Sequence, residues 1–156
     1  VGDKTLVMDR RASDNEYFHQ AFHGSLNKGI SYLAETYGED HVRAYLTKFA
    51  KDFYWKVAET AKSDGLSAIA EKIRDSYEKE HASEVLSLDL TEDCLKVTVS
   101  ECPAEKFLRS RQVKLSPLYY LSTEVVMDTL AQMSGYQFSM DSYDPANGAA
   151  CYRFFK

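Results

Sequence analysis

The residue best suited to chemistry in this sequence is a cysteine that directly precedes a proline, Cys102-Pro103. Alternating apolar residues before Cys102 predict a strand, and proline is typical of the first residue of a helix. The unpaired N–H groups and the dipole at a helix N-terminus favour negative charge, so this position can stabilise a nucleophilic thiolate. The alternative is a small buried cysteine that fills a strand–helix junction.

Two histidines, His19 and His23, lie four residues apart and share one face of an expected helix. An unperturbed pKa of about 6.5 suits His23 to proton transfer near neutral pH. His23 also lies beside the apolar face that Phe22 marks, so a hydrogen-bonded interfacial histidine is the alternative. With Glu16 one turn earlier, the two histidines have the geometry of a mononuclear metal site.

A Glu-x-x-His unit occurs twice, ending at His19 and at His81, as in ferritin-like di-metal bundles. Such a bundle needs four long helices, whereas hairpin patterns fill the second half of this chain. Gly-rich phosphate loops, Gly-x-Ser-x-Gly, His-Glu-x-x-His and Cys-x-x-Cys are all missing from the sequence. We therefore expect neither a metal nor another cofactor.

Glu124 and Asp128 are four residues apart on another expected helix, beside the apolar face of Val125. Paired carboxylates can divide acid and base roles between them, although a solvated helix face explains the same spacing. The candidate catalytic residues are thus Cys102, His23, His19 and Glu124.

Helical periodicity dominates residues 1–82. A capping box at Ser13–Glu16 opens a first helix that Gly38 ends, a second helix follows up to residues 63–65, and a third frays near residue 81. Gly24 and Gly29 lie inside the first helix at a cost to helix stability. We expect them to permit close packing of another element.

The period changes to two after residue 83. We expect a hairpin at residues 85–99, a helix from Pro103 to about Arg111, a helix from Ser116-Pro117 to Gly135, and a last hairpin at residues 136–155. This order predicts one α+β domain over residues 1–156, with an antiparallel sheet of about four strands and helices covering one face. Cys94 and Cys151 fall within strands, where we expect them to be buried and inert.

Composition narrows the function classes. Eleven Tyr, 8 Phe and 1 Trp suit a core around a partly polar cavity, or simply a tyrosine-rich core. The net charge of -5 without a basic stripe argues against nucleic-acid binding. No apolar run has the length of a membrane span, no signal peptide is visible, and three cysteines favour a reducing compartment. We expect a cytoplasmic protein with a small-molecule partner and leave homodimer formation open.

Three segments together resemble the L-2-amino-thiazoline-4-carboxylic acid hydrolase family of small bacterial domains: Cys102-Pro103 after a strand, the closing strand at residues 150–155, and residues 32–39. The resemblance implies opening of a cyclic thiazoline amino acid toward cysteine. It also implies a further Cys and Asp near residues 119–124, where this sequence reads Tyr-Tyr-Leu-Ser-Thr-Glu. That departure predicts a changed substrate or a loss of catalysis. A looser likeness is to ligand-binding domains of the four-vinyl-reductase type.

Two hypotheses follow from these patterns. The first is a hydrolase of a small C–N or C=N substrate, in which Cys102 attacks an amidine-like carbon and His23 moves protons. The second is a non-catalytic module that binds or senses a planar or apolar ligand in an aromatic-lined pocket.

Overall fold

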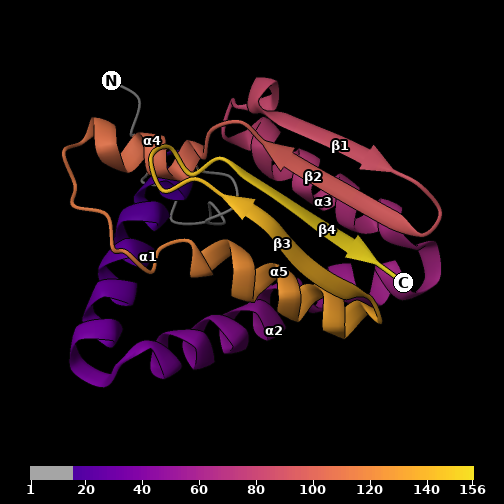
Figure 1. Cartoon of the computed structure of the whole chain (residues 1–156), viewed down its shortest axis with the longest axis horizontal. Coiled ribbons are helices and arrows are strands. Elements are labelled where there is room, and N and C mark those ends of the chain that lie inside the picture. Colours follow the sequence, from indigo (N-terminus) through magenta and orange to yellow (C-terminus); the bar gives the residue numbers. More distant parts are fainter. Residues whose placement is uncertain (1–15) are drawn as a thin grey trace, which may run out of the picture.

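The chain folds into three helices, a hairpin, two further helices and a final hairpin, as Figure 1 shows for the described part of the computed structural model, residues 16–156. In chain order the elements are α1 (Glu16–Tyr37), α2 (Glu39–Asp64), α3 (Leu66–Lys79), the 3-10 turn η2 (Ser83–Val85), β1 (Leu86–Leu90), β2 (Cys94–Val99), α4 (Pro103–Ser110), α5 (Leu121–Ser134), β3 (Gln137–Tyr143) and β4 (Ala150–Phe155). The expected α+β class is confirmed. Within this range no helix combines the length and apolarity that crossing a bilayer requires.

The four strands form one antiparallel sheet in the order β1-β2-β4-β3. Each expected hairpin supplies one edge strand and one central strand. Pairing of β2 with β4 joins the hairpins, and Val97 lies opposite Tyr152 in this pair. The sheet therefore unites residues that are far apart in the sequence.

Helices cover one face of this sheet, as expected. Leu95, Val97 and Phe154 are buried on that face, against apolar residues of α2, α3 and α5. Side chains alternate between faces along a strand, so Cys94 and Cys151 point to the opposite, partly exposed face. Both are half-buried free thiols, and the expectation that they are buried was wrong.

The long helices α1 and α2 meet at an angle at Gly38 (Figure 1). Gly38 has a φ of 90°, a conformation that favours glycine, and it ends α1 as expected. A second core joins α1, α2, α4 and α5 through residues such as Ile30 and Leu46. Among the described residues, a Cβ placed on Gly24 or Gly29 would meet no atom within 4 Å apart from the nearby backbone of α1, so the expectation that these glycines permit close packing of another element was wrong.

The helix expected to start at Ser116-Pro117 begins later, at Leu121. Buried Asn27 of α1 accepts a hydrogen bond from the Ser116 N–H at 2.9 Å and donates one to the Lys114 carbonyl at 3.0 Å. These bonds hold the segment against α1. The next residues form turns with three-residue steps, such as Tyr119 N–H to the Ser116 carbonyl at 3.0 Å.

Candidate functional site

Cys102 lies between the end of β2 and the start of α4. It is the N-cap residue of α4, and Pro103 follows as the first helical residue, as predicted. The Cys102 carbonyl accepts the first hydrogen bond of the helix from the Lys106 N–H at 3.0 Å. The strand–proline–helix pattern therefore located this junction correctly.

The loop of the last hairpin, residues 144–148, packs against Cys102 and leaves it half-buried. The Cys102 N–H donates to the Asn147 carbonyl at 3.0 Å. Gly148 packs so closely that a Cβ on it would lie 2.5 Å from the Cβ of Cys102 and 2.7 Å from the Glu105 carboxyl carbon. Gly148 also has a φ of 71°, so both space and backbone conformation favour glycine here.

Burial raises the pKa of the Cys102 thiol to about 11. The backbone N–H groups of Glu105 and Ala104 at the start of α4 act in the opposite direction, as expected for a helix N-terminus. The carboxylates of Glu105 and Glu80 add to the increase. Desolvation outweighs the helix effect, so the thiol is neutral near pH 7 and the expected thiolate is not the resting form.

Glu105 lies one helical turn beyond Cys102 and is only 2% exposed. Its Oε1 accepts a hydrogen bond from the Tyr143 hydroxyl at 2.6 Å, and its Oε2 accepts one from Arg109 Nη2 at 2.9 Å. Buried carboxylates require such partners. The sequence interpretation missed Glu105, although a Glu three residues after an N-cap is a recognised spacing.

A β-bulge in β3 directs Tyr143 toward Glu105. Phe138 pairs with Phe154 and Met140 with Tyr152 on the helix-covered face, but the register then shifts and leaves Asp141 as an extra residue. Because the bulge absorbs Asp141, Tyr143 pairs with Ala150 on the covered face. In a regular strand that included Asp141, Tyr143 would point outward.

Four tyrosines interact electrostatically with the Cys102 thiol. Burial raises the pKa of Tyr77, Tyr119, Tyr143 and Tyr152, and in each case Cys102 contributes to the increase. They come from α3, the segment before α5, β3 and β4. We call these four tyrosines, Cys102 and Glu105 the thiol cluster.

His23 lies at the edge of the thiol cluster, in an ion-pair geometry with Glu80. His23 Nε2 is 2.6 Å from Glu80 Oε1, and the two side chains are 12% and 11% exposed. Glu80 acts on the pKa values of Cys102, Tyr77 and Tyr119, so the pair is electrostatically linked to the thiol. The side chain of His19 falls outside the described residues.

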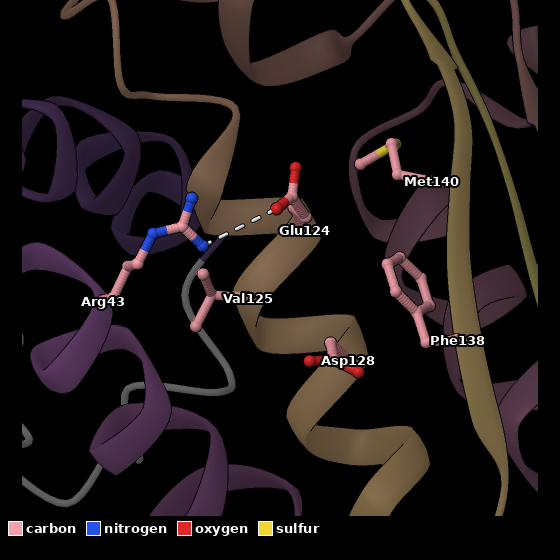
Figure 2. Close-up of a pocket in the computed structure, with 6 residues that line it drawn as sticks. All are labelled: Arg43, Glu124, Val125, Asp128, Phe138 and Met140. Carbon is pink, nitrogen blue, oxygen red and sulfur yellow. Dashed lines mark ion pairs between the residues drawn. The ribbon is translucent and has the colours of Figure 1, made fainter. Parts of the chain in front are cut away.

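Glu124 belongs to a different region, a surface pocket of about 340 Å³ between α2, α5 and β3. Figure 2 shows its six lining residues, Arg43, Glu124, Val125, Asp128, Phe138 and Met140. We call it the α5 pocket. Glu124 is 33% exposed, and its Oε1 lies 3.6 Å from Arg43 Nη1. Tyr120 connects the two regions, because its ring lies 5.4 Å from the ring of Tyr143 and it acts on the pKa of Arg43.

Few side chains in the thiol cluster or the α5 pocket could act together as metal ligands. Among the residues whose side chains the structure describes, no group of three or more His, Cys, Asp or Glu could hold a metal ion. The proposed pair of His19 and His23 is not part of this finding, because His19 lies outside that range.

No protein-family model matches this sequence, and no curated protein matches it significantly.

Proposed function

We propose that this chain binds a small polar molecule at the thiol cluster. The observation that supports this is the concentration of ionisable groups around one sulfur: a thiol, a carboxylate and four phenols, with the His23–Glu80 pair at the edge. Burying such groups is costly, and clusters of groups with perturbed pKa values are typical of functional sites.

The chemistry of the cluster favours a compact, planar ligand that donates hydrogen bonds. Carboxylates such as Glu105 and Glu80 accept hydrogen bonds and favour positive charge. Phenol rings offer flat apolar walls and a polar edge. An amidine-like group, planar and rich in N–H donors, satisfies both requirements.

Thermal unfolding with two amidine-like probes, benzamidine and L-2-aminothiazoline-4-carboxylate, tests this proposal. We expect a saturable rise in Tm with at least one probe, because a ligand that binds the folded state and not the unfolded state stabilises the folded protein. Tyr119→Phe, which removes one hydroxyl from the cluster, should weaken the response, and Glu124→Gln in the α5 pocket should not. A response that Glu124→Gln abolishes and Tyr119→Phe leaves intact would place the ligand in the α5 pocket instead.

The second candidate function is hydrolysis of a C–N or C=N bond. It is favoured by the position of Cys102 at a helix N-terminus, where the N–H groups of Glu105 and Ala104 oppose the effect of burial on its pKa. The raised pKa means that a base must take the thiol proton as the sulfur attacks. Glu105 is the carboxylate one turn away that can accept it.

In that reaction the sulfur forms a bond to the amidine-like carbon. The π electrons of C=N move to nitrogen, which takes the proton that Cys102 released to Glu105. The second nitrogen then re-forms a C=N bond and loses one proton, which passes through Glu105 to the first nitrogen as that nitrogen leaves. Water adds to the same carbon and gives one proton to the remaining nitrogen. As the C=O bond forms, the C–S bond breaks and the other proton of water restores the Cys102 thiol. His23 with Glu80 is positioned to exchange protons at the edge of the cluster.

Mass spectrometry of the probes after incubation separates the two functions. Binding alone leaves the mass of each probe unchanged. Hydrolysis that opens the thiazoline ring adds the elements of water, whereas hydrolysis of benzamidine replaces NH with O and releases ammonia. Cys102→Ser should abolish product formation because a serine hydroxyl is a much weaker nucleophile. Full turnover by Cys102→Ser would remove the nucleophile from this mechanism.

A further inference from the structure

The loop at residues 144–148 is an ordered turn with its own hydrogen bonds. The Asp144 carbonyl accepts from the Gly148 N–H at 2.8 Å, and Asp144 Oδ1 accepts from the Ala146 N–H at 2.8 Å. Asn147 Oδ1 accepts from the Ala149 N–H at 3.0 Å. With these internal bonds the loop can move as a unit without losing its own structure.

Arg109 attaches this loop to α4. Its Nη2 donates to the Pro145 carbonyl at 2.9 Å and to Glu105 Oε2 at 2.9 Å, and its Nη1 donates to the Ala146 carbonyl. One guanidinium thus connects the loop to the buried carboxylate of the thiol cluster. Its side chain is 39% exposed, and its two bonds to the loop lie at the surface, whereas its bond to Glu105 is partly buried.

Asn147 provides the other attachment. Its carbonyl accepts from the Cys102 N–H at 3.0 Å, and its Nδ2 donates to the Ser100 carbonyl at 3.2 Å. Residues 144–146 are exposed, and Gly148 is the buried residue of the loop. The loop is therefore held mainly by a few polar bonds, which is typical of segments that open locally.

We propose that residues 144–148 form a strap that closes over the thiol cluster, and that Arg109 is the latch whose release further exposes the half-buried Cys102. The small molecule that would enter through the open strap is the ligand of the proposed function, and only this part of the inference rests on that function. The opening of the strap itself requires no ligand. Figure 1 shows the strap at the end of the β3–β4 hairpin, beside α4.

Thiol alkylation measures this opening directly. In a Cys94→Ser/Cys151→Ser background, Cys102 is the only cysteine that N-ethylmaleimide can modify. We expect slow modification whose rate is nearly independent of urea well below the unfolding transition, because local opening exposes little surface. A rate that follows global unfolding at every urea concentration would overturn the proposal.

Two variants act on the strap in different ways. Arg109→Ala removes the latch, and we expect roughly tenfold faster modification because hydrogen bonds to charged groups are lost. Gly148→Ala adds a Cβ within 2.5 Å of Cys102 and should also accelerate modification, with no change in charge. Arg111→Ala is the matched control. It also removes a guanidinium near the end of α4, but this group lies over the Phe107 ring, 5.4 Å from the ring centre. We expect the control to react at the parent rate.

Equal modification rates in the parent, Arg109→Ala and Gly148→Ala would refute the strap. The same conclusion follows if both variants react faster only in proportion to their lower global stability, which urea unfolding measures separately. If the strap opens as expected but neither probe raises the Tm, the proposed function fails and the strap remains.

Discussion

Glu105 in the thiol cluster and Glu124 in the α5 pocket are two carboxylates on neighbouring helices in contrasting environments. Glu105 is 2% exposed and accepts hydrogen bonds from Tyr143 and Arg109. Glu124 is 33% exposed and lies 3.6 Å from an arginine that also pairs with Glu39 at 2.8 Å. Of the two, only Glu105 depends on its hydrogen-bond partners, because a buried carboxylate that loses them is strongly destabilising.

This contrast shows that an acidic residue can be a candidate site residue for two different reasons, its spacing in the sequence or its burial in the fold. The pairing of Glu124 with Asp128 was visible in the sequence, but it describes a partly solvated helix face around a shallow pocket. Glu105 also has an acid four residues away, Glu101, but Glu101 lies before the start of α4 and pairs with Lys106. The fold instead surrounds Glu105 with other titratable groups, such as Tyr143 and Arg109. Burial therefore distinguishes a functional candidate better here than the spacing of like residues.

The largest expected effect is on Glu105. Glu105→Ala should lower the free energy of unfolding by about 3 kcal/mol, because Tyr143 and Arg109 both lose a charged partner. Glu105→Gln should cost less, since it keeps an acceptor for Tyr143 and the shape of the side chain. Urea denaturation followed by circular dichroism measures both values. If Glu105→Ala lowers the free energy of unfolding by less than about 1 kcal/mol, the Glu105 carboxylate contributes no more to stability than a partly exposed carboxylate in the α5 pocket.

Alkaline pH should weaken the fold through Cys102, whose pKa rises from 9.0 to about 11 on folding. The folded state holds the thiol proton more tightly, so this contribution is complete below pH 9 and disappears as the pH passes 11. The loss should be on the order of 2 kcal/mol. Buried tyrosines titrate at higher pH and have the same sign, so the difference between the parent and Cys102→Ser isolates the thiol. Parallel stability curves for the two proteins between pH 8 and 11 would contradict this assignment.

Gly148 in the strap and Gly29 in α1 allow the same contrast between a packed and an open site to be tested with one type of substitution. Gly148→Ala should destabilise the protein by about 1–3 kcal/mol, through contact with Cys102 and an unfavourable backbone conformation. Gly29→Ala should instead stabilise it by roughly 0.5–1 kcal/mol, because it adds helix propensity in open space. Thermal and urea unfolding of both variants measure the effects. A stabilising effect of Gly148→Ala would show that the contact with Cys102 and the backbone conformation impose no cost at this position.

The smallest expected effect is on Glu124. Glu124→Ala should change the free energy of unfolding by less than about 0.5 kcal/mol, because exposed ion pairs contribute little and Arg43 keeps its contact with Glu39. Urea unfolding at low salt is the most sensitive measurement. A loss comparable to that of Glu105→Ala would remove the distinction between the two regions.

Local sequence patterns predicted most of the fold. Pro103 marked the start of α4, Gly38 marked the end of α1, and alternating apolar residues marked β1 and β2. The last hairpin was predicted around the turn residues 144–148. Ser116-Pro117 failed as a helix start because the partner of Ser116, Asn27, lies 89 residues earlier in the sequence. Such long-range bonds have no local pattern.

The candidate site was predictable only in part. Cys102 could be identified because its neighbours specify a helix N-terminus. Its ionisation could not, since burial under residues 144–148 depends on a loop far along the chain. His23 was identified as an ionisable residue, but its partner Glu80 comes from the end of another helix. The positions of single residues were thus easier to predict than their electrostatic environment.

The extra residue at Asp141 has a consequence for how this protein can tolerate insertions and deletions. Removing Asp141 would restore regular alternation along β3, because the residues on either side of it already pair with consecutive residues of β4. Tyr143 would stay opposite Ala150, on the covered face of the sheet and toward Glu105. A deletion of a single codon at this position would therefore remove the bulge without turning Tyr143 away from the site. In a comparison of related sequences, a β3 strand that is one residue shorter at this position would still be compatible with the same site.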